Sequence, residues 1–375
     1  MITTAQYIWN NGKWHSQSDE VRDPNFCLMF GSRTVIEQNG RKAVRQLQEI
    51  YPELKIITIS TAGNISSTTV SYDDITATCF EFEKTEVVVK SFKINTKNHK
   101  ELGVTIAKSF DKKNLATALL YSVNGINVGH LIDGINETFN NEVKVSGGVA
   151  GDGLLFEKTL VGIGEDIDSE SIIIIGLYSK HLQVSHGNEG GWNTFGPQRI
   201  VTKSKNNIVY EIDNIPVLDV YKEYLGIKAK ELPGSGLLFP FAIIDKETGK
   251  FIIRGVQDVD DKSKSITFFS DVKEGQSFRL MRSNKDNLIK GAGISAQKSL
   301  QELPSPQVAI LVSCVARRLA LDQIIEDEID EISSTLGSET KICGFYSYSE
   351  FSPLEGATNC SLHNQAMTIT TLSET

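Results

Sequence analysis

The stretch from residue 307 to residue 350 constrains the fold of this chain more than any other part of its sequence. It opens with a short apolar run at Val308–Val312 and continues into apolar residues spaced by four, three and four, which form one face of a helix. Gly337 ends that helix, and a second apolar run follows at 341 to 343. A strand, a helix and a strand in this order predict a right-handed parallel crossover, which places both strand ends at one edge of a sheet. Open sheets of this kind bind ligands at that edge.

The same pattern occurs twice earlier in the chain, at residues 26 to 64 and 115 to 153. Each segment contains an apolar strand, an amphipathic helix and a second strand that ends in small residues, although the letters differ. Between residues 237 and 284, four strand candidates follow one another with turn residues between them, which predicts antiparallel pairing. We therefore predict an α+β fold with two domains, mixed or antiparallel sheets flanked by helices, and recurring strand–helix–strand modules.

Composition suggests where the domains begin and end. Residues 1 to 25 are polar apart from two tryptophans and are interpreted as a loosely ordered N-terminal lead-in. A change of composition near residues 205 to 215 divides the remainder into one domain at 26–214 and another at 215–375. Two alternating runs between residues 76 and 94, broken at 84 to 86, predict a β-hairpin.

Charge and cysteine content exclude several classes of protein. The formal net charge of -9 leaves no basic excess to neutralise phosphates, so no nucleic-acid partner is expected. The five cysteines are odd in number and widely spread, which indicates neither a disulfide framework nor a zinc site, and no metal site is assigned. No secretory signal is visible, and the longest apolar run is too short to span a bilayer. We therefore expect a cytoplasmic protein without membrane insertion.

Polar residues at the expected strand ends are the candidates for binding. Arg317 and Arg318 follow a strand and precede an acidic helix, so one guanidinium would hold a ligand carboxylate through two parallel bonds. The alternative is a salt-bridged surface. Glu350, in the facing loop, would hold an amine, and the two charges together would suit a zwitterion such as an amino acid. Asp152 lies in a glycine-rich loop that either lines the ligand site or forms a tight turn.

Two histidines raise the question of a haem cofactor. His186 precedes a glycine-rich stretch, is interpreted as lying in a loop, and has Trp192 and Phe195 nearby, so it would ligate haem iron from one side. His363 is the other candidate iron ligand, and the alternative for it is a hydrogen-bonded structural histidine. Without a CxxCH signal, any haem would be held non-covalently. No GxSxG or HExxH motif occurs, so no catalytic residue is assigned, and an enzyme acting on a small polar metabolite stays an alternative.

Six short motifs resemble those of a known family. ISTAGN, GGVAGDG, HGNEGGWNTFGP with the VT that follows it, SCVARR, GFYSYSE and LHNQAMTIT resemble, in this order, the motifs of the FIST family. The resemblance covers most of residues 25 to 371. It implies a FIST N and a FIST C domain, which act as small-ligand sensory modules in signal transduction. This sequence differs from the family's pattern at Ala316 and Ser349, where the family usually has glycine. The identity of the ligand is therefore not inferred from related proteins.

The resemblance also bears on partners and on the pocket. It implies that the protein acts together with a histidine kinase, a cyclase or a receptor. Because the sequence shows no segment of these kinds, we expect the signalling partner to be a separate protein. One branch of the family consists of haem-binding nitric-oxide sensors, so haem is a possible cofactor and such a sensor is an alternative function. Together with the strand-end positions, the motifs predict a ligand pocket lined by these residues: Ser60, Thr61, Gly63, Gly148, Asp152, Ser313, Arg317, Arg318, Tyr346, Ser347, Glu350, His363 and Asn364.

Overall fold

Three strand–helix–strand modules form the centre of the molecule, as the sequence predicts. The computed structural model describes residues 1–18, 21–244 and 251–375. In each module the two strands are parallel neighbours, and these pairs are β3 (Phe26–Ser32) with β4 (Lys55–Thr61), β9 (Leu115–Ser122) with β10 (Lys144–Val149), and β23 (Val308–Cys314) with β24 (Lys341–Ser347). The helices that join them are α1 (Arg33–Val35), η1 (Ile36–Gly40) and α2 (Arg41–Ile50); α4 (Val128–Phe139); and α7 (Val315–Leu321), η4 (Asp322–Ile324) and α8 (Glu326–Leu336).

Each module is the middle of its own mixed sheet. The strand orders are β12-β11-β4-β3-β7-β1-β2, β26-β25-β10-β9-β13-β8 and β14-β27-β23-β24-β5-β6. The further strands are β1 (Ile2–Asn10), β2 (Lys13–Ser16), β5 (Asn64–Ser66), β6 (Thr69–Ser71), β7 (Ile75–Phe82), β8 (Glu86–Lys93), β11 (Val161–Ile163), β12 (Asp166–Asp168), β13 (Ser171–Tyr178), β14 (Leu182–Glu189), β25 (Ser349–Pro353), β26 (Cys360–His363) and β27 (Met367–Glu374). Two more helices, α3 (His99–Lys108) and α6 (Lys285–Leu300), complete the body.

The three modules exchange strands in a cycle. Past its second parallel strand, the chain of each module crosses into the sheet of another module, so that β5 pairs with β24, β25 with β10, and β11 with β4. A ring of three backbone hydrogen bonds closes the cycle: Ala62 N–H to Tyr346 O (2.8 Å), Gly151 N–H to Ser60 O (2.8 Å) and Tyr348 N–H to Val149 O (3.1 Å). We call this the central ring. Because of the exchange, two of the three sheets contain strands from both halves of the chain.

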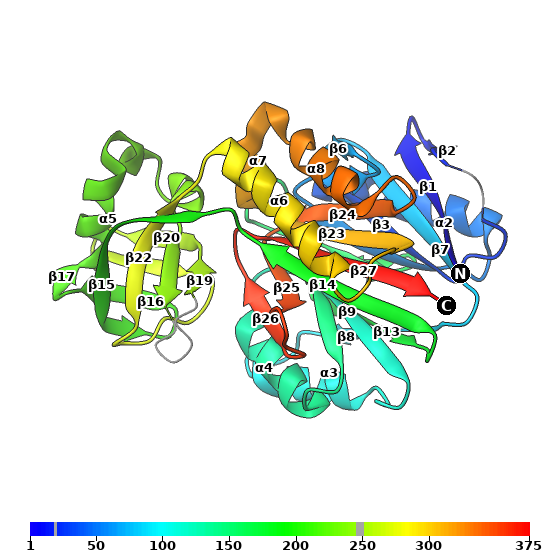
Figure 1. The fold of residues 1–375 in the computed structure, drawn as a ribbon, viewed down its shortest axis with the longest axis horizontal. Coiled ribbons are helices and arrows are strands. Elements are labelled where there is room, and N and C mark those ends of the chain that lie inside the picture. The colour runs from blue at the N-terminus through cyan, green and yellow to red at the C-terminus, as the bar shows by residue number, and fades with distance from the viewer. Residues whose placement is uncertain (19–20, 245–250) are drawn as a thin grey trace.

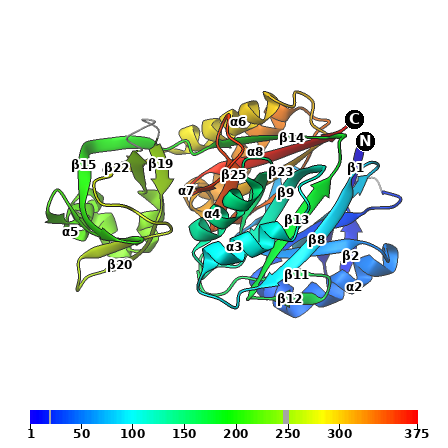
Figure 2. The ribbon, with the colours of Figure 1, turned by 90° about the horizontal axis from the view of Figure 1, so that it is seen from below.

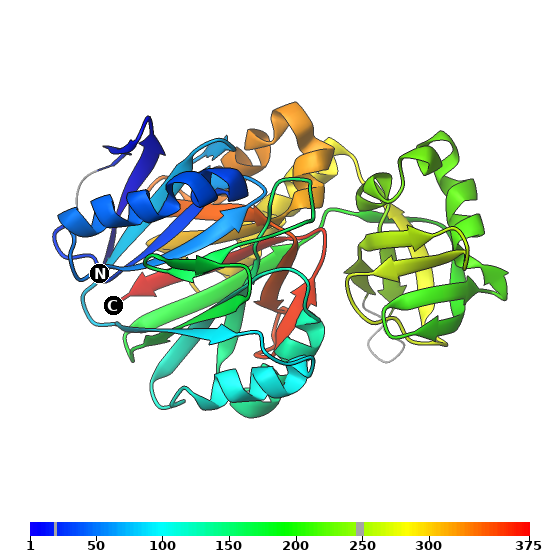
Figure 3. The same ribbon diagram turned by 180° about the vertical axis from the view of Figure 1, so that it is seen from behind.

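The inner faces of the three sheets share one apolar core, and helices cover their outer faces (Figures 2 and 3). Phe30 and Phe345, from two different modules, stack with ring centroids 5.1 Å apart. The second strands approach their neighbours closely, because a Cβ on Gly344 would lie 2.0 Å from the carbonyl oxygen of Leu311. Only glycine fits such a position. The interior is therefore filled by side chains and by closely packed backbone.

A small lobe lies to one side of the body (Figure 1). Its strands are antiparallel, as predicted, and it has its own apolar core. Its elements are β15 (Asn193–Lys205), β16 (Ile208–Ile212), β17 (Ile215–Pro216), α5 (Val217–Leu225), η2 (Gly226–Glu231), η3 (Gly234–Leu238), β18 (Phe241–Ile244), β19 (Phe251–Arg254), β20 (Val256–Asp260), β21 (Ser265–Phe268) and β22 (Ser277–Arg282). The chain enters the lobe at residues 190 to 192 and leaves it at 283 to 284. None of the described helices has the length and apolar character that crossing a bilayer requires.

Two local predictions are wrong. The first residues are not loosely ordered, because β1 pairs with β7 and buries Ala5, Tyr7 and Trp9, which lie at alternate positions of the strand. The two runs between residues 76 and 94 do not form a hairpin, because β7 pairs with β1 and β3 whereas β8 pairs with β13 in another sheet. Alternation identifies a strand, but it does not identify the strand's partner.

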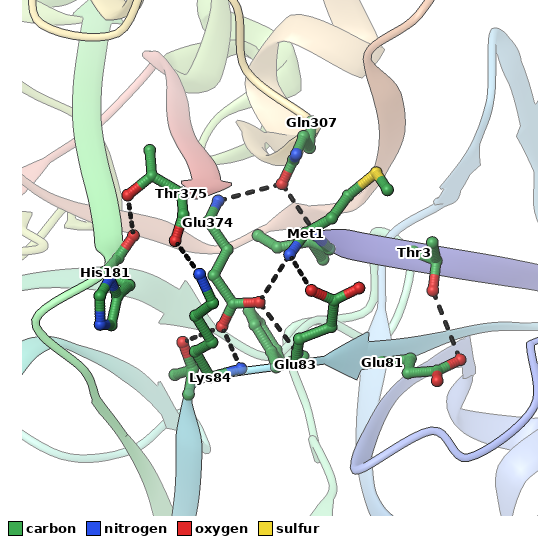
Figure 4. A network of polar contacts seen from close by, with 12 residues as sticks. Met1, Thr3, Glu81, Glu83, Lys84, His181, Gln307, Glu374 and Thr375 are labelled. Carbon is green, nitrogen blue, oxygen red and sulfur yellow. Dashed lines mark hydrogen bonds and ion pairs between the residues drawn. The ribbon is translucent and has the colours of Figure 1, made fainter.

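The turn between β7 and β8 is held by the last strand (Figure 4). The buried carboxylate of Glu374 accepts hydrogen bonds from Glu83 N–H (2.8 Å), Lys84 N–H (2.8 Å) and Thr85 Oγ1 (2.7 Å), and lies 3.1 Å from the amino group of Met1. Burial by itself raises the pKa of Glu374, but the hydrogen bonds outweigh it and lower the pKa below its usual value. The two ends of the chain therefore meet at one buried charge.

Candidate functional site

The strand ends that the sequence singles out meet at the central ring. Ser60 and Tyr346 are members of the ring, and Ser313, at the end of β23, is buried beside them. Gly148 lies in β10, one residue before the ring, where a Cβ would be 2.7 Å from the side chain of Val312, so this glycine serves close packing. The lobe covers this end of the body, through contacts of η3 with α7 and of β19 with β26. We call the region between the ring and the lobe the junction.

A buried polar network occupies one side of the junction. Arg317 is fully buried, and its Nε and one terminal nitrogen donate to Oε2 of Glu328 at 2.9 and 2.7 Å. The other oxygen of Glu328 accepts from the hydroxyls of Tyr346 (2.6 Å) and Ser313 (3.3 Å). Burial, and then the Glu328 carboxylate, raise the pKa of Tyr346 well above its usual value. The carboxylate partner of Arg317 is thus a residue of α8 and not an open position for a ligand.

The same guanidinium connects the two chain segments that lead to the lobe. Arg317 donates to the carbonyl oxygen of Gly190 (2.6 Å), where the chain enters the lobe. It also donates to the carbonyl oxygen of Leu288 (2.8 Å), in the first turns of α6, just after the chain leaves the lobe. Charge-assisted bonds of this kind are stronger than neutral ones. Arg317 therefore braces both connections at once.

Arg318 and the end of β4 are engaged on the opposite side of α7. The guanidinium of Arg318 lies 4.1 Å from the ring centre of Tyr72 and donates to the carbonyl oxygen of Ala62. Thr61 Oγ1 donates to Asn64 Oδ1 (2.7 Å). Gly63 lies against Tyr72 and Tyr346, because a Cβ there would be 3.0 and 3.1 Å from their rings. These residues hold the corner between β4 and β5.

Asp152 holds the loop that follows β10. Its carboxylate accepts from the backbone N–H groups of Phe156 (2.9 Å), Glu157 (3.1 Å) and Lys158 (2.9 Å). It also accepts from the hydroxyl of Tyr348, whose ring stacks on Phe156 with centroids 4.2 Å apart. Every one of these contacts fixes the loop, which matches the tight-turn interpretation of the glycine-rich motif.

Glu350 is a buried acid rather than an exposed carboxylate. Its oxygens accept from Ser347 Oγ (2.9 Å) and from the N–H of Ala366 (3.2 Å), and Cys314 lies beside it. Burial raises the pKa of Glu350 to about 8, although the Ser347 hydroxyl opposes the change. At neutral pH the group is therefore mostly protonated, and it does not offer the negative charge that an amine would need.

His363 and Asn364 lie next to Glu350 across the β25–β26 ladder. Burial lowers the pKa of His363 to about 4, so its ring is neutral, and Nε2 lies 3.0 Å from the carbonyl oxygen of Ser352. Asn364 donates to Ser349 Oγ (3.2 Å) and accepts from the N–H of Gly255 in the lobe (3.4 Å). Asn364 thus links the body to the lobe.

The most unusual polar group of the junction is Gln365, which sequence reasoning missed. Its side chain is 1% exposed, yet neither amide atom has a hydrogen-bond partner within the part of the chain that the structure describes. Its φ of 56° is in the left-handed region, which only glycine enters at little cost. A Cβ on Gly255 would be 2.8 Å from Nε2 and 3.2 Å from Oε1, so the amide lies against the lobe. A buried polar group without a partner costs about 1–3 kcal/mol.

Two charged residues of the lobe also reach the junction. Arg254, at the end of β19, makes one hydrogen bond among the described residues, to the adjoining carbonyl of Ile253 (3.2 Å). Burial lowers the pKa of Arg254 to about 10, and nearby Asp271 opposes that change. Asp271 Oδ2 lies 3.4 Å from His130 Nε2 in the body, whereas its Oδ1 is buried without a partner. Sequence reasoning missed these two residues because Arg254 ends an antiparallel strand and Asp271 lies in the loop after β21, and neither belongs to a strand–helix–strand module.

An apolar contact seals the junction from the other side. Cys314 and Ala316 pack on Leu237 of the lobe, with Phe269 and Leu319 at the margin of the same cluster. Ala316 is fully buried, so its methyl group is part of this contact. Ala316 therefore contributes apolar surface where the lobe meets the body.

His186 lies apart from the junction and not in a loop, because it is a residue of β14 that pairs with Thr370. Burial lowers the pKa of His186 to about 3, and neither ring nitrogen has a partner among the described residues. The cavity that it lines measures about 30 Å³, whereas pockets for ligands of drug size measure roughly 300–1,000 Å³. The ring of His363 is already bonded to Ser352. The surroundings of these two histidines therefore do not fit haem.

Comparisons with known proteins bear on the family and the fold. The FIST N domain model matches residues 25–215, and the FIST C domain model matches residues 218–353. No curated protein matches the chain. Among solved structures, the chain is similar to cyanuric acid hydrolase from A. caulinodans, with 6% sequence identity, a TM-score of 0.39, and coverage of 94% of this chain and 90% of that chain.

Proposed function

Because the chain belongs to the FIST family, whose domains are associated with small-ligand sensing in signal transduction, we propose that it binds a small polar metabolite, such as an amino acid, at the junction. The bound state is passed to a separate signalling protein of the cytoplasm, such as a histidine kinase, a cyclase or a receptor. The sensor releases its ligand unchanged.

The observation that carries this proposal is the unpartnered amide of Gln365. Buried amides in folded proteins almost always have partners, and an unpaired one destabilises the protein. Gln365 also has a left-handed backbone conformation, which adds to the cost of this position. Such a residue is favoured at the junction only if a further molecule supplies hydrogen-bond partners for its amide. A ligand with a donor and an acceptor would do so, because an amide offers both.

The route from ligand to output runs through Arg317. The ligand contacts the lobe beside Gly255 and the body at Gln365, so its arrival changes how the two pack. Arg317 holds both connections to the lobe and, through Glu328, the helix α8. A small shift of the lobe is thereby transmitted to the outer surface of the body, where a partner binds.

A thermal-shift screen of the purified protein tests the proposal. The panel contains amino acids, nucleotides and haem, with an absorbance scan near the Soret band after haem addition. A ligand at 100 times its dissociation constant stabilises the folded state by about 2.7 kcal/mol, which is a clear rise in Tm. We expect Gln365→Met to abolish that rise and to raise the Tm of the unliganded protein, because the variant removes two unpaired polar atoms. Gln183→Met, at an exposed position of β14, is the matched control and should change neither.

Four results would contradict the proposal. If no compound raises the Tm, ligand sensing at the junction is wrong. If a compound binds equally well to Gln365→Met, the site lies elsewhere. If a bound compound is converted to product, the protein is an enzyme, and if haem binds and gives a Soret band, the haem branch applies.

A further inference from the structure

The end of the lobe that lies away from the body carries a narrow apolar groove between α5 and β15 (Figure 1). The pairing of β15 with β22 is interrupted between Phe195 and Arg199, and the groove lies at this interruption, where Pro197, Val220 and Tyr224 form part of its walls. We call it the outer groove. Its hollow measures about 10 Å³, which is close to the space of one water molecule, whereas pockets for small molecules measure roughly 300–1,000 Å³. The outer groove therefore has room for the tip of an aliphatic side chain and not for a metabolite.

Exposed apolar side chains surround the outer groove. Tyr224 is both a wall residue and exposed, and the exposed Ile200 directly follows Arg199 in β15. Ile227 lies just beyond the end of α5 and is 80% exposed. The exposed Ile215 belongs to the same rim, because Asp213 N–H donates to the carbonyl oxygen of Ile200 (2.9 Å) and holds the turn before Ile215 against β15. Single exposed apolar residues are common, but a group of them around a groove indicates a contact surface.

Two arginines bracket two aromatic rings on the same face of the lobe. The guanidinium of Arg282 lies 5.3 Å from the ring centre of Phe195, and that ring meets the ring of Tyr224 edge-on with centroids 6.2 Å apart. The guanidinium of Arg199 lies 5.9 Å from the ring centre of Tyr224. Arg199 has a carboxylate partner in Asp213 at 3.2 Å, whereas the exposed Arg282 forms no ion pair among the described residues. Arg282 is therefore a cation that a second protein can pair with.

The charge that remains on this face is positive. The exposed Lys230 lies three residues after Ile227 and, within the part of the chain that the structure describes, has no carboxylate partner either. The acidic residues of α5, Asp219 and Glu223, project at helical spacing from a different side of the helix than Tyr224 and the other groove residues. A partner that complements this face combines aliphatic side chains with negative charge.

We propose that the outer groove docks an acidic amphipathic helix of another protein. One aliphatic side chain of that helix enters the hollow, and its neighbours at helical spacing cover the exposed isoleucines of the rim. Its carboxylates pair with Arg282 and Lys230. The inference goes beyond the function proposed above, because it does not depend on a ligand at the junction. It adds a contact that is separate from the surface of the body through which the output passes.

A second copy of this chain complements the outer groove less well. The exposed acidic helix of the body is α8, whose apolar residues Ile329, Ile332 and Leu336 are buried in the body's own core. It therefore offers carboxylates without free aliphatic side chains. A nucleic acid likewise brings negative charge but no aliphatic side chain for the hollow.

Selection from a displayed library of helical peptides on the immobilised whole protein tests the inference. The library offers apolar, acidic and basic residues equally at its varied positions. We expect the enriched peptides to combine leucine or isoleucine, spaced by three and four, with aspartate or glutamate beside them. In isothermal titration of an enriched peptide, Ile227→Glu and Arg282→Glu should each weaken binding at least about 10-fold, because one places a charge among apolar contacts and the other reverses a charge.

Matched controls come from the body. Ile50→Glu and Arg22→Glu make the same chemical changes at exposed positions there and should leave the affinity unchanged. Both altered positions of the lobe are also exposed, so the variants should fold, and the Tm of each variant without peptide checks this.

Several outcomes would overturn the inference. Enrichment of basic or uncharged peptides, no enrichment at all, or unchanged affinity of both lobe variants would each show that it is wrong. If vesicles of phosphatidylglycerol bind the protein in place of peptides and Ile227→Glu prevents this, the surface contacts a membrane instead. If sedimentation shows dimers that Ile227→Glu dissociates, the surface joins two copies of the chain instead. None of these results alters what the thermal-shift screen decides about the junction, so the two proposals fail separately.

Discussion

At the scale of single residues, Glu350 is the group whose behaviour differs most from its sequence appearance. Its pKa of about 8 exceeds the usual value of 4.5 because the side chain is buried. Between these two pH values the folded protein holds a proton that the unfolded chain has released. Folding is therefore favoured at the acidic end of this window, and the contribution of Glu350 is lost as the pH rises through about 8.

This gives a pH-dependent prediction. The free energy of unfolding should fall by up to about 1.4 kcal/mol per pH unit as the pH rises from 4.5 to 8, and Glu350→Gln should reduce that slope. Urea unfolding at several pH values measures it. The exposed Glu355→Gln is the control and should keep the slope of the unaltered protein. Identical slopes for the protein and for Glu350→Gln would show that this acid is not the cause.

The sequence identified where the important residues lie better than which groups they contact. Position at a strand end follows from local pattern, and Ser60, Ser313 and Tyr346 do lie at or near the ends of β4, β23 and β24. Contact partners depend on elements that are distant in the chain. Glu328 belongs to an acidic helix face that looks solvated, and nothing local shows that it turns inward to Arg317. The unpaired amide of Gln365 is likewise invisible without its surroundings.

At the scale of elements, the three modules were predictable because each is a local unit. Strand, helix and strand are read from periodicities of two and of about 3.6 residues, and the parallel pairing follows from the crossover. The exchange of strands between modules was not predictable, because β5, β11 and β25 are short and their partners come from other modules. The hairpin prediction for β7 and β8 failed for the same reason.

The close approach of parallel strands inside a module can be tested with one methyl group. Gly344→Ala should destabilise the protein by about 3 kcal/mol or more, because its Cβ would lie 2.0 Å from the backbone oxygen of Leu311, which cannot move away alone. Gly234→Ala, whose Cβ would meet nothing within 4 Å, should change the stability by less than about 0.5 kcal/mol. Equal stabilities of the two variants in urea unfolding would refute the close approach.

At the scale of the whole molecule, the body and the lobe differ in how they are connected. The body contains strands from both halves of the chain. The lobe is one continuous segment with its own apolar core, joined to the body at residues 190–192 and 283–284. We predict that hydrogen exchange in mild denaturant resolves two units. Peptides of β4, β10 and β24 should open together, and peptides of β18 and β22 should open separately from them. Separate opening of β4 and β24 would contradict an interleaved body.

The central ring has a consequence for how substitutions act at this place in the fold. In a homotrimer, a substitution on the rotation axis enters three times, once in each subunit. Here the ring donors are Ala62, Gly151 and Tyr348, three different residues encoded separately in one gene. Each of the three positions can be altered alone, so one side of the ring can change while the other two keep their packing.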